Sequence, residues 1–160
     1  AASRISCPRT RSWCSWASTR PSRRRDLVTR TRRLVAALLL VATVVAGLLV
    51  HGVLPDTVAT DIAGDALYAV AAYLAVVLIA PRLPALATGA IAAAWCVAVE
   101  LFQLTGLPLA WGAQFAPVML VLGTVFDARD LLVYVATIVL ATAVDALIRR
   151  AQSGAAAPRP

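Results

Sequence analysis

The chain has 160 residues, of which 61% are hydrophobic and only 14% are charged. Soluble domains carry about 25% charged residues, and disordered chains are poor in apolar residues, so this composition excludes both classes. The apolar residues also lie in long runs. This pattern is typical of a helical protein that crosses a membrane several times.

The formal net charge of +7 is placed unevenly along the chain. All fifteen basic residues are arginines, and ten of them lie in residues 1–33. Because an apolar run follows this segment at once, the segment indicates the cytoplasmic flank of a first membrane helix rather than a nucleic-acid-binding arm. We expect residues 1–33 to form a disordered cytoplasmic tail, or to include sequence upstream of the true start.

Neither the cysteines nor the histidine predicts a metal site. Cys7 and Cys14 are separated by six residues in the arginine-rich segment, and Cys96 lies in an apolar run. These spacings are not those of a zinc site or of a disulfide framework. His51 is the only histidine, and a single histidine without clustered ligands is typical of a hydrogen-bonded interfacial residue. We therefore expect no metal and no cofactor.

Four apolar runs are long enough to cross a bilayer as helices, which takes about 20 residues at a rise of about 1.5 Å each. Breaks that contain proline, glycine or aspartate separate the runs. The first break, residues 55–63, is expected to be a turn. After the last run, residues 149–160 are expected to form a second disordered cytoplasmic tail. The predicted membrane helices are residues 34–54, 64–80, 85–104 and 130–148.

Residues 107–126 are apolar but contain two glycines, a glutamine and two prolines. If they crossed the membrane as a fifth span, the arginines at the end of the chain would lie outside. Four spans with both termini inside place fourteen of the fifteen arginines on the cytoplasmic side, in agreement with the positive-inside rule. The sequence therefore predicts an all-α polytopic membrane protein with four spans, in which residues 107–126 form a re-entrant or interfacial segment.

Ionisable residues inside the predicted spans are few. A charge at the centre of a bilayer costs about 2.5–3.5 kcal/mol on insertion scales, and such residues often mark function. Glu100 is the only glutamate of the chain, and helical spacing places it on one face with Gln103 and with small residues. In the four-span arrangement the polar ends of three helices meet at one level. We expect a polar pocket there, near the outer membrane face and roofed by residues 107–126. Its candidate members are Asp65, Tyr68, Glu100, Gln103, Asp130 and Tyr134.

Each candidate also has a simpler explanation. Asp65 and Asp130 stand where helix N-caps are expected, a position that the helix dipole favours for an acidic side chain. Glu100 and Gln103 could hydrogen-bond a neighbouring helix and serve only its packing. The spacing of four residues between Asp145 and Arg149 predicts an ordinary ion pair at the inner end of the last helix.

Four short motifs in this order resemble a family of small bacterial membrane proteins, domain of unknown function 2809 (DUF2809). They are G-D-x-L at 64–67, E-x-x-Q at 100–103, L-G-x-x-F at 122–126 and D-L-x-x-Y at 130–134. The resemblance covers residues 34–148 and implies structural roles for Gly64, Gly123 and Phe126. It also selects Asp65, Glu100, Gln103 and Asp130.

Two further points follow from the resemblance. Members of the family often carry a basic residue before the L-G-x-x-F motif, whereas residues 113–119 have none here, which leaves Arg129 as the only outer cation. The layout is more loosely similar to VanZ-like proteins, which share a helix-borne E-x-x-Q and a later aspartate that opens the last span. Those proteins are associated with glycopeptide-antibiotic resistance at the cell envelope.

Three functions are open for such a protein in a bacterial plasma membrane. The first is a non-enzymatic binding or envelope-associated role, in which the pocket holds a polar headgroup, a lipid-linked precursor or a partner membrane protein. The second is a transporter or a transporter subunit, which would have to oligomerise. The third is an intramembrane enzyme with Glu100 as acid or base. The first is favoured, because no nucleophile stands beside a base and no metal cluster or phosphate loop is evident. Its expected partners are the lipid bilayer and the ligand, not nucleic acid, and no catalytic residue is assigned.

Overall fold

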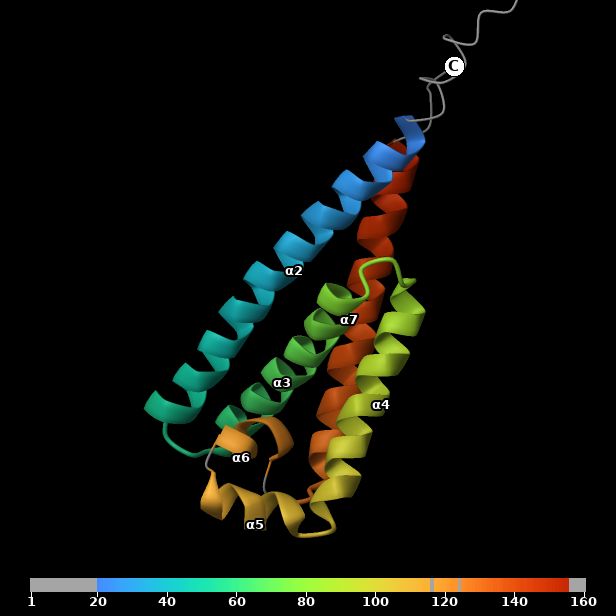
Figure 1. Cartoon of the computed structure of the whole chain (residues 1–160). Helices are drawn as coiled ribbons and strands as arrows, with labels where there is room; N and C mark the ends of the chain where they lie inside the picture. The colour runs from blue at the N-terminus through green and yellow to red at the C-terminus, as the bar shows by residue number, and fades with distance from the viewer. Residues whose placement is uncertain (1–19, 116, 124, 156–160) are drawn as a thin grey trace, which may run out of the picture.

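The computed structural model describes residues 20–115, 117–123 and 125–155. Within these residues every regular element is an α-helix, so the predicted all-α class is confirmed. In Figure 1 the helices run from blue near the N-terminus to red near the C-terminus. They are α2 (Arg20–Val53), α3 (Val58–Ile79), α4 (Ala85–Gln103), α5 (Leu107–Gln114), α6 (Pro117–Leu122) and α7 (Ala128–Ala155).

Four of these helices are long and apolar enough to cross a membrane. The candidate spans are Asp26–Val53 in α2, Val58–Ile79 in α3, Ala85–Gln103 in α4 and Ala128–Gln152 in α7. The protein is therefore a multi-pass membrane protein with the four spans that the sequence predicts. At a rise of about 1.5 Å per residue, α5 and α6 are each far too short to cross a bilayer core of about 30 Å. They lie across one end of the long helices instead (Figure 1).

The turn between the first two spans is shorter than predicted. Residues 55–63 were expected to be a turn, but α3 already begins at Val58. The reason is a capping box: the Thr57 hydroxyl accepts from the Thr60 backbone N–H at 3.3 Å, and the Thr60 hydroxyl accepts from the Thr57 N–H at 2.8 Å. This pair satisfies two free N–H groups at the start of the helix. As a consequence Asp61 lies inside α3.

Two predicted tails are partly helical. Residues 1–33 and 149–160 were expected to be disordered, whereas α2 begins at Arg20 and α7 continues to Ala155. Arginine is a good helix former, and extending a helix that the membrane already holds avoids the cost of nucleation. The rest of both predicted tails, residues 1–19 and 156–160, lies outside the described residues.

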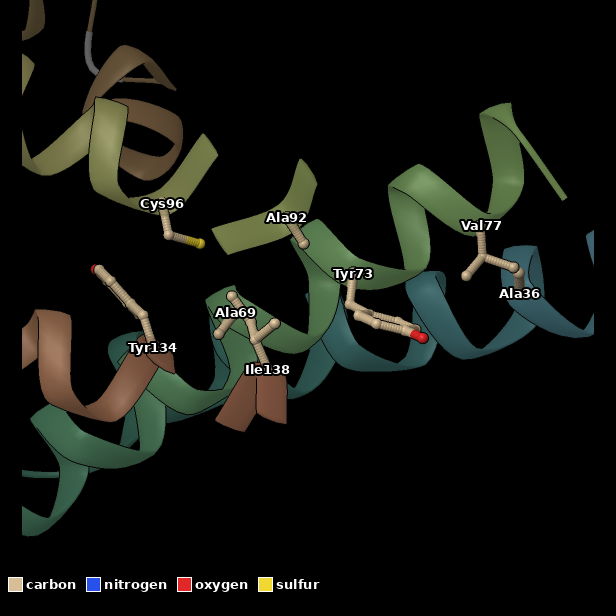
Figure 2. Close-up of a cluster of buried hydrophobic side chains, with 8 residues drawn as sticks. All are labelled: Ala36, Ala69, Tyr73, Val77, Ala92, Cys96, Tyr134 and Ile138. Atoms are coloured by element: carbon tan, nitrogen blue, oxygen red, sulfur yellow. The ribbon is translucent and has the colours of Figure 1, made fainter. Parts of the chain in front are cut away.

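Helix α3 occupies the middle of the bundle, since it packs against α2, α4 and α7. Figure 2 shows the buried side chains that join the four helices; among them are Ala69 of α3 and Ala92 of α4, which are both fully buried. Small residues allow such close approach between membrane helices. Gly89 of α4 serves the same purpose, because a Cβ there would overlap the Thr142 side chain of α7. The buried cluster comprises Ala36, Ala69, Tyr73, Val77, Ala92, Cys96, Tyr134 and Ile138.

The two ends of the bundle differ in chemistry. At the arginine end, where α3 turns into α4, the carboxyl group of Asp145 accepts from Arg32 at 2.8 Å, from Tyr73 at 2.9 Å and from Arg149 at 3.0 Å. The predicted Asp145–Arg149 pair is thus present. Arg149 also donates to the Leu83 carbonyl oxygen at 2.7 Å, which fixes the α3–α4 turn. The opposite end, where α2 turns into α3, is called the cavity end below.

Candidate functional site

A cavity of about 490 Å³ lies at the cavity end. It is bordered by the last turns of α2, the first turns of α3, the end of α4, the segment before α7 and the first turns of α7. Among the described side chains around it, polar and acidic groups predominate. The lining residues are Gly47, Val50, His51, Asp56, Thr60, Asp61, Gly64, Asp65, Gln103, Gly123, Val125, Phe126, Asp127, Arg129, Asp130 and Tyr134.

The structure brings most of the predicted pocket residues to this cavity. Asp65, Gln103, Asp130 and Tyr134 line it, and so do the three residues with expected structural roles, Gly64, Gly123 and Phe126. They meet because α3 and α7 begin, and α4 ends, at the same level. Of the stretch 107–126, which was expected to roof the pocket, Gly123, Val125 and Phe126 line the cavity.

Asp65 and Asp130 are not helix caps. The residues that cap α3 and α7 are Thr57 and Asp127; the Asp127 side chain accepts from the Arg129 N–H at 2.8 Å. Asp65 instead lies two turns inside α3, and it lines the cavity together with Asp130. The simpler explanation for these two residues, N-capping, is therefore wrong.

Glu100 is fully buried behind the cavity wall. Its Oε2 atom accepts a long hydrogen bond of 3.4 Å from the Asp127 backbone N–H, at the N-terminus of α7. The positive end of a helix dipole favours an anion at this position. Its Oε1 atom is buried and has no hydrogen-bond partner among the described residues. Glu100 thus joins α4 to the start of α7 without lining the cavity itself.

Gln103 contributes the second unpartnered buried oxygen. The side chain is 7% exposed and lines the cavity. Its Nε2 atom donates to the Leu122 carbonyl oxygen at 3.0 Å, which ties the end of α4 to the end of α6. Its Oε1 atom has no partner among the described residues. If the Gln103 amide were flipped, its Oε1 atom would face the Leu122 carbonyl oxygen, and neither atom can donate. The contact with Leu122 therefore determines which end of the amide is Nε2 and which is Oε1.

Tyr68 lies beside the cavity rather than in it. Its hydroxyl group donates to the Val121 carbonyl oxygen at 2.7 Å and accepts from the Trp95 indole N–H at 3.0 Å. Its ring packs against that of Tyr134, with centroids 5.8 Å apart. Tyr68 therefore holds α3 to α4, α6 and α7. The sequence placed it on the polar side of its helix but could not show that α6 would use its hydroxyl group.

Sequence reasoning missed the acidic wall that the α2–α3 turn and the start of α3 contribute. Asp56 and Asp61 were assigned to an outer turn, yet both line the cavity, as does His51. The signal that could have revealed Asp61 is the Thr-x-x-Thr pair at 57–60, which moves the start of α3 toward the N-terminus. Among the described residues, no three His, Cys, Asp or Glu side chains converge closely enough to hold a metal ion.

Comparison with known proteins gives one match. The family model described as "Protein of unknown function (DUF2809)" matches residues 54–138, just over half of the chain. The matched segment includes α3, α4 and the first part of α7, and thus most of the cavity wall. Searches of curated proteins and of solved structures found no match. They give no support to the looser similarity to VanZ-like proteins.

Proposed function

The chain belongs to the DUF2809 family, whose function is unknown, and we propose that it is a non-enzymatic binding protein of the membrane that holds a small polar ligand at the cavity end. The observation that carries this proposal is the Oε1 atom of Gln103. It is a buried acceptor without a hydrogen-bond partner among the described residues, and Gln103 belongs to the wall of a cavity large enough for a small molecule. A buried polar atom without a hydrogen bond costs about 1–3 kcal/mol, which a bound donor would recover.

We propose further that the cavity end faces the outside of a bacterial plasma membrane. Arg32, Arg82 and Arg149 all lie at the arginine end, where they contact Asp145, Asp26 and the α3–α4 turn. Among the described residues, Arg129 is the single arginine that lines the cavity. Arginines concentrate on the cytoplasmic side of membrane helices, so this distribution supports a ligand that comes from the envelope side.

Soluble probes of different charge test the binding role. The protein in detergent micelles is melted with ethanolamine, with glycerol 3-phosphate and with glucose, which represent a cationic, an anionic and a neutral polar group. A ligand that binds only the folded state raises the melting temperature by mass action. We expect at least one probe to do so.

A cavity-filling pair of variants supplies the control. Gly64 lines the cavity and Gly52 does not, and a Cβ added at either position meets no atom within 4 Å. Gly64→Leu should therefore fold and occupy the cavity, whereas Gly52→Leu places the same side chain elsewhere. We expect stabilisation by the probe to be lost in Gly64→Leu and kept in Gly52→Leu. If no probe stabilises the protein, or if both variants respond equally, the proposed function is wrong.

A further inference from the structure

The cavity presents hydrogen-bond acceptors and negative charge to whatever enters it. Five aspartates line it: Asp56, Asp61, Asp65, Asp127 and Asp130. Arg129, which also lines the cavity, lies 3.7 Å from the Asp127 carboxylate and is half exposed. Acidic side chains alone do not define a ligand. A second, independent observation, made at Gln103, restricts the chemical class of the ligand.

That observation is the orientation of Gln103. Its donor nitrogen is already used by Leu122, while no residue that the structure describes donates to its buried Oε1 atom. A ligand that suits this oxygen must bring N–H or O–H donors, and the aspartates favour one that is positively charged. A metal ion fits less well, because no three candidate ligands converge among the described residues.

Resting on the proposed function, we propose that the ligand carries a primary ammonium group, which donates to Gln103 Oε1 and to the Asp65 and Asp130 carboxyl groups. An ammonium group has three N–H donors, and hydrogen bonds between charged groups are about twice as strong as neutral ones. The recognised chemistry is the protonated amine itself. It can belong to a free amine or to the headgroup of an aminophospholipid such as phosphatidylethanolamine.

The arrangement of α2 and α7 is compatible with both sources. The Arg32–Asp145 ion pair holds these helices together at the arginine end, and Figure 1 shows that they spread apart toward the cavity end. The cavity lies in this wider part, with Gly47 and Val50 of α2 on one side and Tyr134 of α7 on the other. A headgroup bound there could keep its acyl chains in the surrounding lipid.

The first experiment compares ethanolamine with choline on the full chain in detergent micelles, by calorimetric titration. Choline has the same charge but no N–H donor. We expect ethanolamine to bind at least about 10-fold more tightly than choline, which corresponds to about 1.4 kcal/mol. Equal affinity for the two amines would overturn the inference, since only the charge would then matter.

Variants locate the binding groups. Asp65→Asn removes a negative charge with little change of shape, and Asp26→Asn makes the same change at the arginine end. Gln103→Met removes the free acceptor, and circular dichroism and gel filtration verify its folding. We expect Asp65→Asn and Gln103→Met to weaken ethanolamine binding at least about 10-fold and Asp26→Asn to leave it unchanged. Unchanged binding in the folded Asp65→Asn variant would exclude the proposed site.

Nanodiscs distinguish the two sources of the amine. The protein is reconstituted in phosphatidylcholine alone or in phosphatidylcholine mixed with phosphatidylethanolamine, and soluble ethanolamine is titrated into both. A headgroup ligand occupies the site in the mixed discs, so soluble ethanolamine binds more weakly there. A free amine binds equally in both. If glycerol 3-phosphate or glucose stabilises the protein and ethanolamine does not, the ammonium inference fails while the proposed binding function stands.

Discussion

Arg32, on the first described helix, donates a hydrogen bond of 2.8 Å to Asp145 on the last, across 113 positions of the sequence. Their side chains are only 19% and 17% exposed. Arg149 and Tyr73 donate to the same carboxyl group, so one aspartate joins α2, α3 and α7. Since α2 otherwise packs along α3, this contact sets where α2 and α7 converge, and hence how far they spread at the cavity.

Asp145→Asn should therefore lower the free energy of unfolding in detergent by about 1–3 kcal/mol, because two arginines lose a charged, partly buried partner. Arg82→Gln is the matched control. Arg82 pairs with Asp26 over 3.5 Å, and both side chains are mostly exposed. Such a pair contributes about 0–1 kcal/mol. Equal losses of stability in denaturant titrations of the two variants would show that the Asp145 cluster has no special structural role.

Substitutions of Gly123 and Gly106 by alanine distinguish the effect of backbone strain on stability from the effect of a side-chain overlap. Both glycines have a positive φ, +65° and +69°, which a residue with a Cβ adopts at a cost of about 1–2 kcal/mol. A Cβ at Gly106 would meet no atom within 4 Å, whereas one at Gly123 would overlap the Nε2 atom of Gln103. Gly123→Ala should thus displace the amide that Leu122 holds.

We expect Gly106→Ala to lower stability by the backbone cost alone and to leave probe binding intact. Gly123→Ala should lower stability further and also weaken binding of the probe that stabilises the wild type. Thermal unfolding with and without the probe measures both effects. If Gly123→Ala binds the probe as the wild type does, the position of the Gln103 side chain is not important for the cavity.

Gly89 tests the packing of α4 on α7. A Cβ at this position would overlap the Thr142 hydroxyl oxygen, so the Thr142 side chain would have to rotate or the two helices to move apart. Gly89→Ala should cost about 1–3 kcal/mol, as overpacking of a close contact commonly does. Thr142→Ala removes the overlapping atom and should restore part of that stability in the double variant.

Gly64 lies in open space on α3, where an added Cβ meets no atom within 4 Å. Gly64→Ala should therefore raise the free energy of unfolding by about 0.5–1 kcal/mol through helix propensity.

The helices were predictable because each span is a long apolar run, and chain order then determines which ends share a level. That reasoning alone brought Asp65, Gln103, Asp130 and Tyr134 to one place. The same reasoning gave the wrong start for α3, because a single local contact determines where that helix begins. The Thr57 capping box shifts the start of α3 and moves Asp61 into the cavity wall.

Hydrogen bonds between residues far apart in the sequence could not be predicted, for a different reason. Nothing in α2 identifies Arg32 as the arginine that reaches α7, because the choice depends on how two helices 113 positions apart cross. The hydroxyl group of Tyr68 is likewise used by Val121, in a short helix whose path the apolar pattern does not determine. Hydrophobic periodicity specifies which elements form, not the angles at which they meet.

The orientation of the bundle provides the last prediction. Alkaline phosphatase is active only outside the cytoplasm and a fluorescent reporter folds only inside, so fusions after Ala128 and after Gly154 report the two ends of α7. The arginines at the far end predict that Ala128 lies outside and Gly154 inside. The reverse result would place the acidic cavity in the cytoplasm. An envelope ligand would then be excluded, and a cytoplasmic amine or an inner-leaflet headgroup would be the only sources left for the proposed ammonium site.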